Sequence, residues 1–208
     1  MIFDTNDDTT KRIPQLKALG VATVIRYLSR SYTWKTVTPN EAKALAQAGI
    51  KLGLVFETTG KPSGLNTGSL DGTAAIRFAK EVGAPTGAVI WYAVDYDPSP
   101  NDMPGIEAAF TGFSGVVRQA GYRVGIYGSG FCNAALLAKG LVDKRWLTQS
   151  LGFRGTRDAI RTHQYDLLQL LPKHVAGLDT DPDVPLIPNG DIGDFLAFAP
   201  APAQPGEA

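Results

Sequence analysis

Two carboxylates separated by one residue end the most apolar segment of the chain. Residues 88–94 are almost entirely apolar, as expected of a strand covered on both faces, and Asp95 and Asp97 follow directly. Because side chains two apart leave the same face of a strand, we expect both carboxylates to point to one side. Two carboxylates can supply the general acid and the base or nucleophile that break a glycosidic bond. This segment therefore predicts part of an active site.

Further acidic residues end or follow other predicted strands: Asp4, Glu57, Asp179 and Asp181. In a closed parallel barrel, the C-terminal ends of the strands share one rim, and that rim holds the active site. Because the first and last strands of such a barrel are neighbours, we expect these acids to face Asp95 and Asp97 across a common mouth. Converging carboxylates raise one another's pKa, so that one can stay protonated and serve as a general acid.

Aromatic and polar side chains lie near the same predicted strand ends. Sugar rings present apolar C–H faces that stack on aromatic side chains, while their hydroxyls need polar partners. Tyr127, at the end of the strand predicted over 123–128, is the best candidate for an aromatic residue on the rim. Arg26 and Gln164 are candidates for hydrogen bonds to the sugar hydroxyls.

Short apolar runs alternate with helical stretches along the chain. The predicted strands cover residues 1–5, 21–28, 51–57, 87–97, 123–128, 145–149, 162–171 and 175–178. The predicted helices cover residues 11–19, 41–48, 71–82, 104–120, 131–141 and 157–161. This alternation predicts a parallel sheet, and about eight strands favour a single-domain α/β fold, a (β/α)8 TIM-like barrel, over an open doubly wound sheet. The late helices are short, so we expect an irregular barrel.

Composition limits the classes of function. The 208 residues carry 20 Lys and Arg against 20 Asp and Glu, so the net charge is zero and no nucleic-acid partner is indicated. The single cysteine, Cys132, cannot form an intramolecular disulfide, and His163 and His174 are too few for a His-based zinc site or triad. No Gly-rich phosphate fingerprint follows the first strand, and no cofactor or metal is expected. No stretch approaches the ~20 apolar residues of a membrane span, so no membrane insertion is expected.

Several segments of the chain form an ordered pattern: Phe3-Asp4, the run Tyr92-Ala93-Val94-Asp95-Tyr96-Asp97, Gly125-Ile126-Tyr127-Gly128, Trp146-Leu147, His163-Gln164-Tyr165 and Gly177-Leu178-Asp179-Thr180-Asp181. Together they resemble the glycoside-hydrolase-like domains of unknown function that are allied to family 25 lysozymes. The resemblance covers roughly residues 1 to 198, and the Pro/Ala-rich residues 199–208 are expected to be a tail or a linker to a second module.

The resemblance implies an irregular barrel that acts on bacterial peptidoglycan, at the bond between N-acetylmuramic acid and N-acetylglucosamine. In family 25 lysozymes an Asp-x-Glu on the fourth strand supplies the key carboxylates, and here Asp95 and Asp97 match that pair. Asp4 matches the first-strand Asp of the family, and Asp179 or Asp181 matches the last-strand Asp. Asp97 is one methylene shorter than the Glu it matches, so its carboxyl reaches about 1.5 Å less far.

These observations combine into one hypothesis. Asp97 is the general acid and Asp95 the second carboxylate. The predicted substrate-binding residues are Asp4, Arg26, Glu57, Tyr127, Gln164, Asp179 and Asp181. The partner is peptidoglycan or a related glycan, met outside the cell, in the periplasm or at the cell wall. The chain shows no signal peptide, which suits a phage lysin, a secreted effector or a trimmed chain.

Three alternatives remain open at this point. The barrel is a catalytically silent glycan binder, or it cleaves another polysaccharide, or it is a metal-dependent hydrolase that uses Asp4, Asp95 and Asp97.

Overall fold

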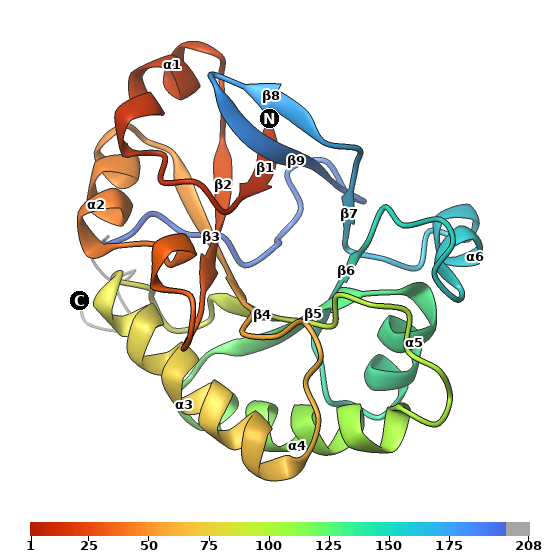
Figure 1. Ribbon diagram of the computed structural model, residues 1–208. Coiled ribbons are helices and arrows are strands. Elements are labelled where there is room, and N and C mark those ends of the chain that lie inside the picture. Colours follow the sequence, from red (N-terminus) through yellow and green to blue (C-terminus); the bar gives the residue numbers. More distant parts are fainter. Residues whose placement is uncertain (199–208) are drawn as a thin grey trace, which may run out of the picture.

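A closed ring of strands with helices around it forms residues 1–198, the part of the chain that the computed structural model describes (Figure 1). Neighbouring strands pair in parallel from the first to the seventh: β1 (Ile2–Thr5), β2 (Thr23–Leu28), β3 (Lys51–Phe56), β4 (Val89–Ala93), β5 (Arg123–Gly128), β6 (Lys144–Leu147) and β7 (Leu167–Gln169). β9 (Leu178–Pro185) closes the ring and runs antiparallel to both β7 and β1. β8 (Lys173–Val175) forms a hairpin with β9. The predicted single-domain α/β barrel is confirmed.

The helices follow the strands in the first six units: α1 (Ile13–Ala18), α2 (Pro39–Gln47), α3 (Leu65–Glu81), α4 (Met103–Gln119), α5 (Gly130–Ala138) and α6 (Thr156–Arg161). Short 3₁₀ turns precede α1 and α2, namely η1 (Thr10–Arg12) and η2 (Thr33–Lys35). β7 leads after three residues into β8, with no helix between them. The expectation of an irregular barrel with reduced late helices is therefore correct.

Three expected boundaries are wrong. β4 ends at Ala93, so the strand alternation that would place Asp95 and Asp97 on one face does not extend to them. The last strand lies at Leu178–Pro185 rather than 175–178, because a tight hairpin turns the chain back into the ring. α3 begins at Leu65 rather than at residue 71, and Asp71 accepts a hydrogen bond from the Tyr92 hydroxyl within the protein interior.

Side chains fill the inside of the barrel. The inward-facing apolar residues form one cluster: Ile25, Val55, Val89, Trp91, Ala93, Trp146, Leu167 and Ile192. Trp91 and Trp146 pack edge to face, with ring centroids 5.8 Å apart. Gly125 makes room for Trp91, since a Cβ at residue 125 would lie 2.2 Å from the Trp91 ring. The barrel is thus a packed core rather than a pore.

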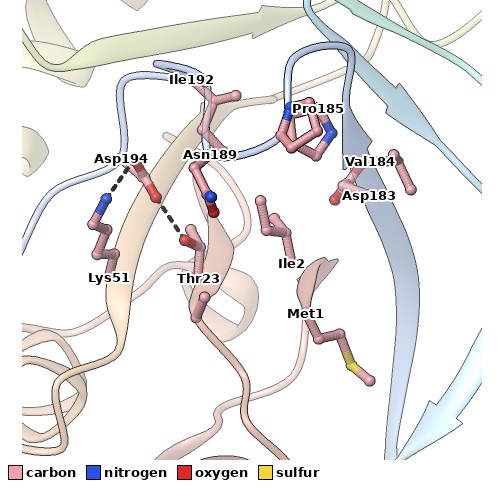
Figure 2. Close-up of a pocket in the computed structure, with 13 residues that line it drawn as sticks. Met1, Ile2, Thr23, Lys51, Asp183, Val184, Pro185, Asn189, Ile192 and Asp194 are labelled. Atoms are coloured by element: carbon pink, nitrogen blue, oxygen red, sulfur yellow. Dashed lines mark hydrogen bonds and ion pairs between the residues drawn. The ribbon is translucent and has the colours of Figure 1, made fainter.

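The segment after β9 closes the end of the barrel where the parallel strands begin. Its backbone pairs with β3 and β4, through Leu52 with Phe195 and through Val89 with Gly193. A pocket of about 380 Å³ lies beneath this segment (Figure 2). Two of its charged residues pair with each other, because Asp194 accepts hydrogen bonds from Thr23 and from Lys51.

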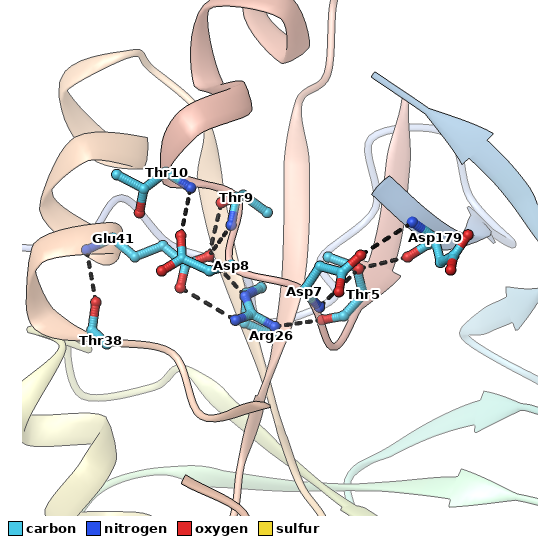
Figure 3. A network of polar contacts seen from close by, with 9 residues as sticks. All are labelled: Thr5, Asp7, Asp8, Thr9, Thr10, Arg26, Thr38, Glu41 and Asp179. Carbon is cyan, nitrogen blue, oxygen red and sulfur yellow. Dashed lines mark hydrogen bonds and ion pairs between the residues drawn. The ribbon is translucent and has the colours of Figure 1, made fainter. Parts of the chain in front are cut away.

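A buried ion pair joins β2 to α2 outside the barrel wall (Figure 3). The Arg26 guanidinium donates to Glu41 over 2.8 Å, and both side chains are almost fully buried. Glu41 also accepts hydrogen bonds from the backbone and hydroxyl of Thr9, and Arg26 donates to the Thr5 carbonyl. The pair therefore fixes the loop from β1 to α1 against the second strand.

Replacing Arg26 with Met should destabilise the fold, because the Glu41 carboxylate would stay buried without its cation. Losing one partner of a buried ion pair costs about 3–5 kcal/mol. Urea unfolding of R26M measures this loss in the free energy of unfolding. Arg77→Met, which removes an exposed pair with Glu81, is the control and should change stability by at most about 0.5 kcal/mol. A variant R26M as stable as the control would show that the buried pair contributes nothing.

Candidate active site

The mouth of the barrel, where β1 to β7 have their C-terminal ends, contains two adjoining hollows. One has a volume of about 340 Å³ and is lined by Asn6, Tyr27, Tyr32, Trp34, Lys35, Glu57 and Asp95. The other has a volume of about 260 Å³ and is lined by Asp4, Thr5, Asn6, Tyr27, Pro172, Asp179, Thr180 and Asp181. Asn6 and Tyr27 border both hollows. The mouth therefore offers two neighbouring compartments, each with its own carboxylates.

Asp4 forms the floor of the second hollow. It lies on β1 opposite Asp181 of β9, and its side chain is 1% exposed. The Tyr27 hydroxyl donates to Asp4 Oδ1 over 3.1 Å, and the Gln169 amide donates to Oδ2 over 3.0 Å. The pKa of Asp4 is raised to about 7, mainly by burial. The negative charges of Asp181 and Glu57 raise it further, while the two hydrogen bonds act in the opposite direction.

A second buried carboxyl lies beneath Asp4. Asp183 accepts a hydrogen bond from the Trp146 indole over 2.8 Å, while its other oxygen has no partner within residues 1–198. Burial raises the pKa of Asp183 well above its ordinary value, and the charge of Asp4 raises it further. A neutral Asp183 is the form that suits this environment, since an unpaired buried charge is strongly disfavoured.

Asp95 faces the first hollow from the loop after β4. Its backbone amide donates to the Gly60 carbonyl, and Gly60 adopts a left-handed φ of +67° that brings the two segments together. The Asp95 carboxyl accepts no hydrogen bond from residues 1–198. Burial raises its pKa, Glu57 raises it further, and Lys35 opposes the rise. Lys35 is itself held by Glu57 over 2.7 Å. Asp95 is therefore an unpaired acid at the mouth.

Asp181 completes the group of acids. It is partly exposed on β9, and its pKa is raised by burial and then by the charge of Asp95. In the same way, the charge of Glu57 raises the pKa of Asp95, and the charge of Asp181 raises the pKa of Asp4. The closed ring thus brings Asp4, Asp95 and Asp181 to one mouth, together with Glu57, as the sequence pattern predicts.

Tyr127, near the end of β5, was expected to be the aromatic residue of the rim, but it lines neither hollow and packs partly buried against the barrel core. Its hydroxyl donates to Gln169 Oε1 over 2.8 Å and lies 3.3 Å from the Thr148 hydroxyl. Its ring packs against Trp146, with centroids 4.8 Å apart. Through Gln169, this tyrosine orients the amide that holds Asp4.

The rim of the first hollow carries exposed aromatic rings. Trp34, on η2, is 65% exposed, and Tyr32 beside it is 46% exposed. The Lys35 ammonium lies 4.9 Å from the centre of the Tyr27 ring and 5.3 Å from that of Tyr32, so cation–π contacts hold this surface in place. The arrangement offers a flat apolar face beside Glu57 and Asp95.

The loop that forms the opposite rim is held by the network of Figure 3. The Thr5 hydroxyl donates to the Asp179 carbonyl over 2.6 Å, and the Asp179 amide donates to Asp7. The Asp179 side chain points outward and pairs with His174 over 2.8 Å. These contacts join the first loop to β9 and keep Asn6 between the two hollows.

Three residues proposed from the sequence lie away from the mouth. Asp97 accepts a hydrogen bond from the backbone amide of Arg154 over 2.7 Å and lines neither hollow. Arg26 is buried in its pair with Glu41 on the outer side of β2, because it has the parity opposite to Tyr27. Gln164 is exposed and precedes β7, which places it toward the other end of the barrel.

Besides Asn6, which borders both hollows, the sequence interpretation missed Tyr32, Trp34, Lys35 and Gln169. Gln169 carried the same signal as the acids, a polar residue that ends an apolar strand. Tyr32, Trp34 and Lys35 lie on the loop after the second strand, at the C-terminal end where barrel sites form. Within residues 1–198 no three His, Cys, Asp or Glu side chains are grouped to hold a metal ion. No helix in that part of the chain combines the length and apolarity needed to cross a bilayer.

Comparison with known families assigns the domain. A family model described as the Rv2525c-like, glycoside hydrolase-like domain matches residues 14–182. The chain belongs to this family. The uncharacterized protein FadG of Bacillus subtilis (strain 168) is 30% identical in an alignment 162 residues long, which covers 71% of this chain and 27% of FadG. The chain therefore spans about a quarter of that curated relative.

Solved structures share the fold of this Rv2525c-like domain. The Tat-secreted protein Rv2525c of Mycobacterium tuberculosis, in complex with HEPES, aligns with a TM-score of 0.75 and 20% identity, over 95% of this chain and 98% of that one. The modular autolysin LytC of Streptococcus pneumoniae, in complex with a synthetic peptidoglycan ligand, aligns with a TM-score of 0.56 and 16% identity. That alignment covers 86% of this chain and 45% of LytC. At sequence identities of 16–20%, these alignments show that the structures share a fold.

The Asp4 carboxyl should titrate near pH 7, far above its ordinary value of 3.8. The folded state then holds this proton more tightly than the unfolded chain, so the free energy of unfolding should fall as pH rises from about 4 to 7. Asp4→Asn should reduce that fall. Carbon-13 NMR of the side-chain carboxyls measures the titration. Asp191, whose pKa is lowered to about 2 by Arg123, is the internal control. An Asp4 signal that titrates together with Asp191 would refute the expectation.

Proposed function

We propose that this Rv2525c-like domain binds a glycan across the barrel mouth and cleaves a glycosidic bond between the two hollows. One observation carries the proposal. Two adjoining hollows share Asn6 and Tyr27, and unpaired carboxyls of raised pKa, Asp95 and Asp181, stand one in each. A glycosidic bond joins two rings and needs a carboxyl group near the bond on each side.

The acids have different environments, which supports different roles. Asp95 accepts no hydrogen bond within residues 1–198 and has a raised pKa, so it is suited to donate a proton to the leaving oxygen. Asp181 supplies the second carboxyl group of the reaction, and Asp4 lies at the floor of the second hollow. This proposal moves the general acid from Asp97 to Asp95, because Asp97 is engaged with the Arg154 amide outside the hollows.

Bacterial peptidoglycan is the proposed substrate, at the bond between N-acetylmuramic acid and N-acetylglucosamine. Support comes from the resemblance to family 25 lysozymes and from the fold shared with LytC, which was solved with a peptidoglycan ligand. The proposed place of action is the cell wall or the space around it, and the related Rv2525c is a Tat-secreted protein.

A glycan-binding barrel without catalysis is the second candidate. One observation favours it: the residue that matches the catalytic Glu of family 25 lysozymes is the shorter Asp97, and its carboxyl lies outside the hollows. Under this alternative the exposed Trp34 and the acids of the mouth hold the sugar, and no bond breaks.

Asp95→Asn should lower the rate of reducing-end release from purified peptidoglycan about 10²- to 10⁴-fold, the range of general acid catalysis. Asp97→Asn is the matched control, since it lies two residues away and keeps an oxygen for the Arg154 amide. It should leave the rate nearly unchanged. Loss of activity in D97N with retention in D95N would return the role of acid to Asp97. Wall binding by the wild type without any release of reducing ends would support the silent binder. Parallel assays on chitin oligomers test another polysaccharide.

Trp34→Ala should weaken glycan binding, because a sugar would lose its stacking partner in the first hollow. Aromatic stacking worth about 0.5–1.5 kcal/mol corresponds to a Kd roughly 2- to 12-fold higher. Isothermal titration with peptidoglycan fragments measures the change. Trp34→Phe should retain most of the affinity. Since Trp34 is 65% exposed, both variants should melt at the wild-type temperature. Equal affinity of wild type and W34A would remove Trp34 from the binding surface.

A further inference from the structure

An uncharged groove lies beside the mouth, on the outer side of β7. It has a volume of about 430 Å³ and is lined by Gln149, Ser150, Leu151, Ile160, Leu168, Gln169, Leu170 and Leu171. Five of these eight residues are Leu or Ile, and none is charged. The volume falls within the roughly 300–1,000 Å³ that small-molecule sites occupy.

The groove exists because the barrel is irregular at this point. β7 turns after three residues into β8, so no helix follows it to cover its outer face (Figure 1). Leu171 stays 69% exposed and Leu151 stays 51% exposed on the two sides of the groove. Contiguous exposed leucines around a hollow indicate a binding surface, in contrast to single leucines scattered over a surface.

The groove adjoins the mouth at the end of β7, where Leu171 lines the groove and the next residue, Pro172, lines the second hollow. Gln169 lines the groove, and its side chain holds Asp4 and accepts from Tyr127 inside the mouth. On the other side, the Ser150 amide donates to the Thr148 hydroxyl, which lies 3.3 Å from the Tyr127 hydroxyl. A ligand that leaves the second hollow across Pro172 and Leu171 therefore meets the apolar surface of the groove.

We propose that the groove binds the hydrocarbon chain of an amphiphilic glycan, a sugar linked to an alkyl, acyl or prenyl chain, while the sugar occupies the mouth. The inference rests on the proposed function for the position of the sugar. The polar, acidic mouth suits the sugar end of such a molecule, and the uncharged groove suits its hydrocarbon end. The small volume of the groove, about 430 Å³, and its place beside the second hollow favour a hydrocarbon chain attached to the sugar.

A chain-length series tests the proposal directly. Butyl, pentyl, hexyl and heptyl N-acetyl-β-D-glucosaminides are titrated into the protein below their micelle-forming concentrations, and binding is measured by calorimetry. Each methylene that enters the groove should lower Kd by up to about fourfold, the fold-change that ~0.8 kcal/mol per buried CH₂ produces. A Kd independent of chain length would overturn the proposal.

A pair of variants tests whether the hydrocarbon chain lies in the groove. Leu171→Asp puts a charge on the groove and should flatten the dependence of Kd on chain length. Leu70→Asp is the matched control, a leucine on α3 that is 59% exposed against 69% for Leu171, and it should keep the wild-type dependence. Both positions are exposed, so both variants should fold. If Kd depends on alkyl chain length in L171D as it does in the wild type, the hydrocarbon chain binds elsewhere and the proposal is refuted.

The remaining outcomes separate this inference from the proposed function. If D95N abolishes glycan hydrolysis and Kd does not vary with chain length, the groove assignment fails while the catalytic proposal stands. If Kd varies with chain length in wild type and D95N alike, but neither cleaves any glycan, the groove assignment stands without catalysis. Light scattering completes the test: dimers that L171D dissociates would identify a second copy as the occupant and overturn the proposal.

Discussion

The antiparallel strand β9 is the element on which the site depends. It pairs with β7 on one side and β1 on the other, and so completes the ring. Its register sets Asp181 opposite Asp4 and places Asp183 opposite Gln169. Acids from the two ends of the chain thereby come together, and beyond the effect of burial the charge of Asp181 raises the pKa of Asp4 while the charge of Asp4 raises that of Asp183. Without this closure, the same residues would be separate solvated carboxylates with ordinary chemistry.

The interior stabilises these acids by hydrogen bonds rather than by cations. Asp4 is held by a tyrosine hydroxyl and a glutamine amide, and Asp183 by an indole N–H. Neutral donors keep a carboxyl oriented without fixing it in the charged form, in contrast to the Arg26–Glu41 pair behind the wall. The protein thus separates two tasks: full charges fix the loops outside the barrel, while carboxyls of raised pKa remain available inside it.

The sequence predicted the features that depend on local pattern. Alternation of apolar strands and helices gave the barrel, and acids at strand ends gave most of the mouth, including Asp4, Glu57, Asp95 and Asp181. It failed where tertiary contacts decide. Asp97 follows a strand that ends at Ala93, so its direction is set by the Arg154 amide rather than by strand parity. The antiparallel course of β9 follows from a tight hairpin with β8, and its place in the ring depends on a long-range pairing with β1, which periodicity does not encode. Lys35 and Trp34 lie on a loop, and only the fold shows that this loop borders the acids.

The bottom of the barrel has a consequence for how a polymer is handled. The Trp91–Trp146 layer fills the axis, and the segment around Ile192 and Gly193 seals the far end. A strand of polysaccharide has no passage through the molecule and has to lie across the open face, entering and leaving sideways. Geometry of this kind needs no free terminus on the polymer, so internal linkages of a cross-linked mesh are as reachable as terminal ones. Under the proposed function, cleavage therefore needs no free end of the polymer.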